Sequence, residues 1–556
     1  MKRKLISIVG VFVVLVCFAT ATVLAYQMVY KEGSMKWYQS KITIATSKSM
    51  GENIQEVSCS HKACSIYDQN YQTVVDQKIS KRLKESYTFD RPLLIYNAYG
   101  TNTTGIQMYF TTTAKVKVAY TIHVADDTIA DYSNTLYAGS DKEYTTDHQY
   151  QLIGLVPNMK NEVTLTLIND KDEVIDTKVL SIMMKELDSK IDTTLALMDG
   201  ESTDELVNGL YTVLGHDKNF NSNIYLYDNN GILRAELPLK SYRSDRVLWI
   251  DDHMVYAYQK NGIMFVNRLG KIEKQYHLGN YEMHHDFEYD KTHQKILVLA
   301  SLKDTESIED RVISLDLKTG EVNELFMRDY FEEAYTSAKA VGGENAYGGT
   351  ETDWIHLNSI SIIDDRDILV SSRELSAVIR MNDIYTTPSL AYTLADESVF
   401  ADTDIAAYNY TKVGDFVAQA GQHSAVYRSS DTLDDGQYYV YLYNNNYKTA
   451  TTRPDFNWEH YPGTGTYNEG SESMYYEYLV DENAQTFTLV KEISLPYSSI
   501  VSSVQQIDSH YMTSSGKANC FNEFDDEGRL IRTFTYTAEK YAYRVFKYTY
   551  QHFWFQ

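Results

Sequence analysis

The chain has 556 residues, too many for one compact core, so we expect two or more folding units. It carries 51 basic and 76 acidic residues, and its net charge of −25 opposes bulk electrostatic binding to nucleic acid or to an anionic membrane surface. Tyrosine is frequent, with 48 residues, and proline is scarce, with 7, a composition that favours strands over long disordered segments.

The first 26 residues predict export. Lys2-Arg3-Lys4 precedes an uncharged run of 22 residues that ends at Tyr26, which is the layout of a secretion signal or of an uncleaved membrane anchor. The run is long enough to span a bilayer, yet Ala19-Thr20-Ala21 and Val23-Leu24-Ala25 both offer small-residue cleavage sites. Both alternatives place the remaining chain outside the cytoplasm, secreted or held at the cell surface.

Residues 27–90 are predicted to form a helical linker. Between Tyr67 and Tyr87 apolar residues recur at three- and four-residue spacing, as in an amphipathic helix. Cys59 and Cys64 are close in sequence, and outside the cytoplasm we expect them to form a short disulfide loop. A metal site that uses His61 is the alternative, but the neighbourhood offers no further ligands, so we predict no metal.

From 91 to 184 the hydrophobic period is two. Val116, Val118, Tyr120 and Ile122 alternate with less apolar residues, and turn residues separate this run from others like it. Short strands without intervening helices predict a small β-sandwich of immunoglobulin type, which could act as a spacer or as a dimerisation surface. A polar connector is expected at 185–218.

The remaining segment, 219–556, consists of strand pairs joined by tight turns. Arg311 to Gly320 and Phe524 to Ile531 are examples. Each has an apolar strand segment and a turn that contains Asp with Gly. Hairpin after hairpin over this length predicts an all-β fold with a β-propeller of about six to eight blades, at roughly 40 to 50 residues per blade.

Four polar clusters in this segment are predicted to converge on one pocket. They are His284-His285-Asp286, Asp353 to Ser359, Ser371-Ser372-Arg373 and Gly421-Gln422-His423. The innermost strand of each propeller blade can direct a side chain at the common axis. Because the intervals from His285 to His356 and from His356 to His423 each exceed one blade, these histidines would come from different, non-adjacent blades or from blades with insertions, and could face one another across the channel.

Strand alternation narrows the candidates within each cluster. Side chains at i and i+2 share a face, so His356 and Asn358 would point the same way, with Trp354 beside them. In a regular strand His284 and His285 point to opposite faces, and only one of them can reach the pocket. We favour His285 and keep His284 as the alternate.

Arg373 stands at the end of a strongly apolar strand. Burying a guanidinium is costly unless an anion pairs with it. An ion pair with Glu374 is one explanation, and a bound oxyanion, which matches the rigid fork of the guanidinium, is the other. Three histidines could instead form a zinc site, but Arg373 and Asn358 suit an oxyanion better than a metal cation.

Together the four clusters resemble those of the bacterial arylsulfate sulfotransferases, which move a sulfuryl group between phenols without the nucleotide donor PAPS. The segment from Asn97 to Asn102 is also similar to a loop in the N-terminal sandwich domain of that family. The resemblance implies a six-bladed propeller preceded by an immunoglobulin-like domain, commonly a homodimer, with no cofactor. It implies an aryl sulfate donor and a phenolic acceptor.

Carried over motif by motif, the resemblance implies that His423 is transiently sulfurylated in a ping-pong reaction. His285, His356, Asn358 and Arg373 would bind the sulfuryl oxygens. Enterobacterial members have a disulfide in the propeller, and no matching cysteine pair is present here. From the residues alone two other classes of function stay open, an exported ligand-binding or adhesion propeller and a metal-dependent propeller hydrolase.

Overall fold

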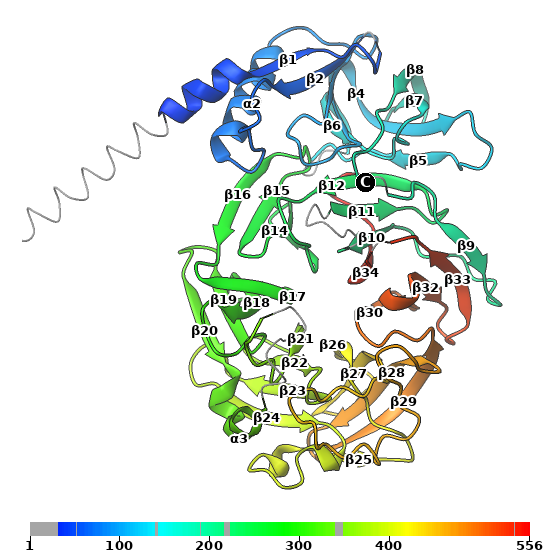
Figure 1. Ribbon diagram of the computed structural model, residues 1–556. Coiled ribbons are helices and arrows are strands. Elements are labelled where there is room, and N and C mark those ends of the chain that lie inside the picture. Colours follow the sequence, from blue (N-terminus) through cyan, green and yellow to red (C-terminus); the bar gives the residue numbers. More distant parts are fainter. Residues whose placement is uncertain are drawn as a thin grey trace, which may run out of the picture.

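The computed structural model describes residues 32–51, 53–139, 143–189, 191–215, 223–339, 349–538 and 540–556. The export segment predicted at 1–26 lies outside these residues. Within the described residues, no helix is long and apolar enough to cross a membrane. Figure 1 shows a small domain, blue to cyan, seated against one side of a ring of sheets coloured green to red.

The small domain is a β-sandwich built around one long strand, β4. Its strands are β1 (Ile42–Thr46), β2 (Ile54–Cys59), β3 (Leu93–Tyr96), β4 (Ile106–Val124), β5 (Tyr132–Thr135), β6 (Thr145–Leu152), β7 (Lys160–Ile168) and β8 (Val174–Met183). The first part of β4 pairs with β3 and β6, and its last part pairs with β5 and β7. Val116, Val118, Tyr120 and Ile122 are buried, as the period-two pattern predicts.

The segment 27–90, predicted as a helical linker, contains strands as well as helices. Residues 32–41 are helical, and α2 spans Gln69–Arg82 with Asp68 as its N-cap. However, β1 and β2 extend the sheet beyond β3, and a disulfide joins Cys59 to Cys64. This segment therefore belongs to the sandwich domain, because its strands find their hydrogen-bond partners there.

Six sheets form the propeller, so the expected all-β, six-bladed architecture is confirmed. Five blades, written from the innermost strand outward, are β13 (Val247–Ile250), β14 (His253–Gln259), β15 (Gly262–Val266) and β16 (Ile272–His277); β17 (Tyr281–Asp290), β18 (Lys295–Leu302), β19 (Arg311–Asp316) and β20 (Val322–Phe326); β21 (Leu357–Ile362), β22 (Ile368–Ser372), β23 (Ala377–Asn382) and β24 (Ser389–Leu394); β26 (His423–Arg428), β27 (Gln437–Asn444), β28 (Ser473–Asp481), β29 (Thr486–Leu495) and β25 (Thr411–Val413); and β30 (Ser502–Ile507), β31 (His510–Ser515), β32 (Cys520–Phe524) and β33 (Leu530–Thr535). A short helix, α3 (Glu332–Ser337), follows β20.

Strands from both ends of the propeller segment close the ring. The sixth blade combines the C-terminal strand β34 (Arg544–Tyr548), which is innermost, with β10 (Leu210–Leu214), β11 (Asn223–Tyr227) and β12 (Leu233–Pro238). β9 (Ala196–Asp199) pairs with β33 of the neighbouring blade. Because β9 and β10 lie within 185–218, the predicted connector contributes two strands, and the propeller begins before 219. Neither strand alternates in burial, since β9 is wholly exposed and β10 wholly buried.

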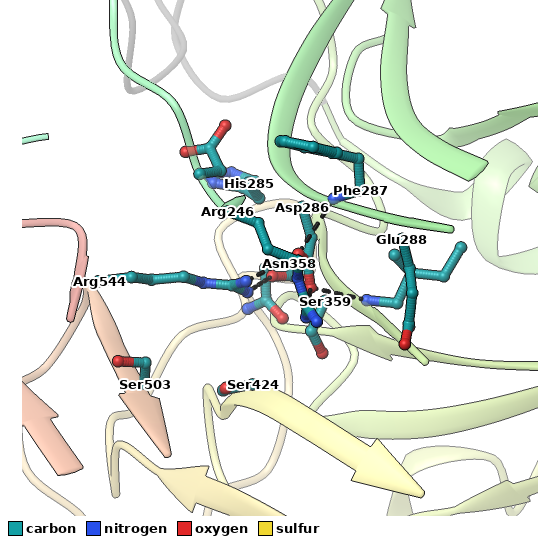
Figure 2. A network of polar contacts seen from close by, with 12 residues as sticks. Arg246, His285, Asp286, Phe287, Glu288, Asn358, Ser359, Ser424, Ser503 and Arg544 are labelled. Carbon is teal, nitrogen blue, oxygen red and sulfur yellow. Dashed lines mark hydrogen bonds and ion pairs between the residues drawn. The ribbon is translucent and has the colours of Figure 1, made fainter. Parts of the chain in front are cut away.

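One carboxylate connects the inner strands of four blades, as Figure 2 shows. Asp286 in β17 accepts hydrogen bonds at 2.8 and 3.0 Å from Arg246, which lies just before β13. It also forms an ion pair with Arg544 of β34 at 2.8 Å. It also accepts the N–H of Ile360 in β21 at 3.2 Å. Burial alone would raise the pKa of Asp286, but the two guanidiniums outweigh burial and hold this pKa below its usual value.

Replacement of Asp286 by Asn should lower the free energy of unfolding by about 3–5 kcal/mol, because it leaves two guanidiniums without their buried counter-charge. Chemical denaturation followed by fluorescence measures this loss. The control is Asp199→Asn, which removes an ion pair to Arg532 whose carboxylate is 73% exposed. That loss should stay below about 1 kcal/mol. Equal losses in the two variants would contradict the structural role of Asp286.

Candidate active site

Three neighbouring inner strands of the propeller bring the predicted histidines together. His284 and His285 lie in β17, His356 directly precedes β21, and His423 begins β26. The ring centroids of His285 and His356 are 4.8 Å apart. Tyr543, directly before β34, stacks on His285 at 5.2 Å, and its ring centroid lies 6.4 Å from that of His423.

Left-handed backbone at non-glycine residues interrupts the inner strands at this point. The φ angles of His285, His356 and Ser424 are 60°, 48° and 58°, a conformation that is uncommon for such residues and concentrates at functional sites. The pairing of β17 with β18 also shifts next to His284. As a result His284 and His285 do not alternate, and both offer ring nitrogens to one cluster with Glu309. The expectation that only one of them reaches the site is not met.

His423 is a neutral imidazole with a fixed tautomer. Its side chain is almost wholly buried, and Nδ1 lies 2.8 Å from Oδ1 of Asn445, an oxygen that can only accept. The amide nitrogen of Asn445 donates to the carbonyl of Ser498 and to Oγ of Ser502, which orients the amide oxygen towards His423. Nδ1 therefore carries the proton and Nε2 carries the lone pair. Burial, and then nearby Arg373, lower the pKa of His423 well below its usual value.

His356, unlike His423, is positively charged. Its Nδ1 lies 2.5 Å from Oδ2 of Asp353 and 2.7 Å from Oε2 of Glu309. Burial and Arg373 lower the pKa of His356, but the two carboxylates outweigh them and raise it to about 8. His356 is thus an imidazolium at neutral pH. Its buried Nε2 has no hydrogen-bond partner among the described residues, so this N–H can donate to a bound oxygen.

Both ring nitrogens of His285 are already engaged. Nε2 lies 2.9 Å from Oε2 of Glu309, and Nδ1 accepts from Nη2 of Arg243 at 3.2 Å. Burial outweighs the carboxylate and lowers the pKa of His285 to about 3. Neutral His285 therefore links Glu309 to Arg243. The role implied for it, direct binding of substrate oxygens, does not fit, because neither nitrogen is available.

The side chains of Asn358 and Trp354 are both engaged by other parts of the protein. Nδ2 of Asn358 donates at 2.7 Å to the carbonyl of Gln422, the residue before His423. Nε1 of Trp354 donates to Asp310 at 2.9 Å, and its ring packs in a hydrophobic core. Trp354 is therefore a core residue and not the pocket neighbour of Asn358 that we expected. The left-handed turn at His356, between them, breaks the alternation on which that expectation depended.

Arg373 supplies positive charge to the two key histidines. Its side chain is 12% exposed, and Nη2 lies 3.7 Å from Oδ2 of Asp353. Its charge lowers the pKa of both His356 and His423. Glu374, the alternative local partner, accepts hydrogen bonds from the neighbouring threonines at 451 and 452.

Two overlapping groups of side chains could hold a metal ion. His284, His285 and Glu309 form one, and Glu309, Asp353 and His356 form the other, with ligand atoms within 4.8 Å of one another in each. However, Arg243 donates to His285, and Arg373 lies beside Asp353. These two guanidiniums oppose a further cation and favour a bound anion.

Sequence reasoning missed four residues of the site: Arg243, Glu309, Asn445 and Tyr543. Arg243 precedes β13 and Tyr543 precedes β34, the inner strands of two of the blades without a predicted cluster, so known blade boundaries would have indicated both. Arg243 lies 3.9 Å from the centre of the Tyr543 ring. The Tyr543 hydroxyl is buried without a hydrogen-bond partner among the described residues, and burial raises its pKa, so it remains a donor.

Two family models match the chain, one over each of its domains. A family model described as Arylsulfotransferase (ASST) matches residues 198–552, and one described as Arylsulfotransferase Ig-like domain matches residues 93–185. No curated protein matches the chain.

Among solved structures, the chain is similar to a catalytically inactive virginiamycin B lyase from Staphylococcus aureus with quinupristin, at 10% identity over 63% of this chain and 89% of that chain, with a TM-score of 0.31. It is also similar to an auxiliary nutrient binding protein from Bacteroides thetaiotaomicron, at 11% identity over 78% of this chain and 94% of that chain, with a TM-score of 0.29. Both likenesses are too distant to support an argument. The family models cover most of the chain, and the chain therefore belongs to the arylsulfotransferase family, whose members are enzymes that act as arylsulfate sulfotransferases.

Proposed function

We propose that the enzyme transfers the sulfuryl group by a ping-pong mechanism through a sulfohistidine at Nε2 of His423. The observation that carries this proposal is that two buried histidines of the site differ in protonation. His423 is neutral, with its proton on Nδ1, and His356 is cationic, with a buried N–H that lacks a partner among the described residues. A nucleophile and a general acid are thus available together.

In the first half-reaction Nε2 of His423 attacks the sulfur of the aryl sulfate. The N–S bond forms as the S–O bond to the aryl group breaks, and His356 gives its Nε2 proton to the departing oxygen. Arg373 and the Tyr543 hydroxyl stabilise the sulfuryl oxygens, because negative charge spreads over them in a loose transition state. A phenol leaves, and His356 becomes neutral.

In the second half-reaction the acceptor phenol gives its proton to Nε2 of His356. Its oxygen attacks the sulfur, the N–S bond breaks, and His423 returns to its neutral form. Asp353 and Glu309 hold Nδ1 of His356 throughout, so they stabilise the proton each time that it returns. Atoms and charges balance without a cofactor.

A metal-dependent hydrolase is the second candidate, favoured by the cluster of His284, His285 and Glu309. A chromogenic aryl sulfate assayed with chelator, without PAPS, and with or without added phenol separates the two. Sulfuryl transfer predicts release that phenol accelerates and chelator leaves unchanged. A hydrolase predicts that chelator abolishes release and that phenol has no effect.

We also propose that the enzyme works outside the cytoplasm. The basic residues Lys2-Arg3-Lys4 followed by an uncharged run support this placement, and so does the disulfide between Cys59 and Cys64, since disulfides persist in oxidising compartments. The run is either cleaved as a signal or retained as a membrane anchor. N-terminal sequencing of the exported protein distinguishes these outcomes.

Brief exposure to an aryl sulfate without acceptor should add one sulfuryl group to the peptide that contains Gln422 and His423. Mass spectrometry of the digested protein measures this adduct. His423→Ala should give no adduct and lose about 10³-fold or more in rate, because the nucleophile is gone. His277→Ala, which changes an exposed histidine on β16, is the matched control. An adduct on another residue would overturn the assignment.

The rate with donors that carry poor leaving groups should fall as the pH rises through about 8, because His356 must be protonated to donate. The acid limb should lie below pH 6.5, since the pKa of His423 is depressed below that reference value. The measurement is kcat/KM across pH. In His356→Gln the alkaline limb should disappear, and the rate should depend more steeply on the leaving-group pKa. An unchanged alkaline limb would exclude His356 as the acid.

A further inference from the structure

A second cavity, which we call the α3 cavity, lies between α3 and the segment 399–405. α3 follows β20 and this segment follows β24, the outermost strands of two neighbouring blades, so the cavity is separate from the histidine cluster. Its volume is about 360 Å³, within the range of sites for small molecules. Much of its lining is apolar, with side chains that are each at most 8% exposed: Phe331, Leu375, Val399, Phe400 and Ile405. An apolar ring therefore has a surface to pack against.

Arg453 supplies hydrogen-bond donors to the α3 cavity. Its side chain lines the cavity, and two contacts hold it there. Nη2 donates to the carbonyl of Glu374, and the guanidinium carbon lies 4.7 Å from the centre of the Phe456 ring. Nε is buried and has no hydrogen-bond partner among the described residues. A guanidinium with unused N–H groups favours a ligand that brings an acceptor oxygen.

Three carboxylates line the same cavity and limit the charge of its ligand. They belong to Glu333, Asp402 and Asp404, and Oε2 of Glu333 accepts the N–H of Asp404 at 2.9 Å. These acids repel an anion, and Arg453 repels a cation. A neutral molecule with an apolar ring and a hydroxyl group satisfies the whole lining, because the hydroxyl oxygen accepts from the guanidinium and its hydrogen is donated to a carboxylate. A phenol has this composition and stays neutral near pH 7, since its reference pKa is about 10.

One tight turn connects the α3 cavity to the active site. Leu375, which lines the cavity, lies in the turn between β22 and β23, two residues after Arg373. The N–H of Arg373 donates to the carbonyl of His356 at 3.1 Å, and the N–H of Ser376 donates to the carbonyl of Arg373 at 3.2 Å. A ring packed against Leu375 therefore restrains the turn that carries Arg373 and that contacts the backbone of His356.

We propose that the α3 cavity is a second, non-catalytic site for a neutral phenol, and that a phenol bound there improves the capture of the aryl sulfate. The ring packs beside Leu375, and the hydroxyl group lies between Arg453 and the carboxylates. Because the bound molecule restrains the turn, Arg373 is held in place before the donor arrives, and less conformational entropy is lost when the donor binds. The inference rests on the proposed function for its ligand class, since a phenol is also the acceptor of that reaction.

Calorimetric titration with 2-naphthol in the absence of donor tests the site itself. Ala334→Trp, on α3, fills the cavity and should remove one equivalent of binding. Arg453→Met keeps the apolar stem and should weaken the same binding about ten-fold, because a charged donor is lost. The controls are Ala407→Trp, at an exposed residue, and Arg328→Met, whose guanidinium stacks on Tyr335 instead of lining the cavity. Wild-type binding in all four variants would overturn the proposal, whether or not sulfuryl transfer occurs.

Steady-state kinetics test the connection to the active site. In a ping-pong reaction kcat/KM for the donor does not depend on the acceptor concentration, so any rise in it reports a phenol bound elsewhere. We expect 2-naphthol to raise kcat/KM for the aryl sulfate about five-fold in the wild type and in Ala407→Trp, and to leave it constant in Ala334→Trp. A constant kcat/KM in the wild type would overturn the proposed coupling. An equal rise in Ala334→Trp would also overturn it, and would contradict the ping-pong mechanism as well, because a sequential reaction gives that result.

Discussion

A carboxylate buried between two guanidiniums holds the geometry of the active site. Asp286 follows the two histidines of β17 directly, and through Arg246, Arg544 and Ile360 it contacts the inner strands of three other blades or the residues just before them. These strands come from distant parts of the chain, so a directed contact at their meeting point determines how the histidines above it align. Burial of one ion pair alone would be unfavourable, but the several donors around Asp286 satisfy its oxygens.

Two buried histidines of the site differ in protonation because their imidazole rings contact different groups. The amide oxygen of Asn445 accepts the Nδ1 proton of His423 without adding charge, so burial keeps that ring neutral. Asp353 accepts a hydrogen bond from His356 and Glu309 forms an ion pair with it, and the charge of these two carboxylates overcomes the same burial and keeps that ring protonated. Neighbouring charge, and not exposure, separates the neutral ring of His423 from the protonated ring of His356.

The sandwich domain also stabilises the closure of the propeller. The C-terminal residues Trp554 and Phe555 pack in a hydrophobic core shared with the sandwich strands, and Phe555 forms a β-bridge with Leu136. Buried Arg234, in β12, donates to the carbonyls of Gly154 and Ala130 in the sandwich domain. The blade that joins the two ends of the ring is therefore held from outside by the sandwich domain.

The sequence by itself determined the all-β class, the period-two strands of the sandwich and the identity of the converging histidines, because burial patterns and motifs are local. Tertiary structure decided which strands close the ring, since β9 and β10 show no alternation of their own. It also decided how the site works. Left-handed turns at His285 and His356 break the period on which side-chain directions were predicted. The protonation of each histidine depends on Asn445, Glu309 and Arg373. These residues stand beyond the next strands of the same blade or on a neighbouring blade, and they reach the histidines only when the hairpins form and the blades pack together.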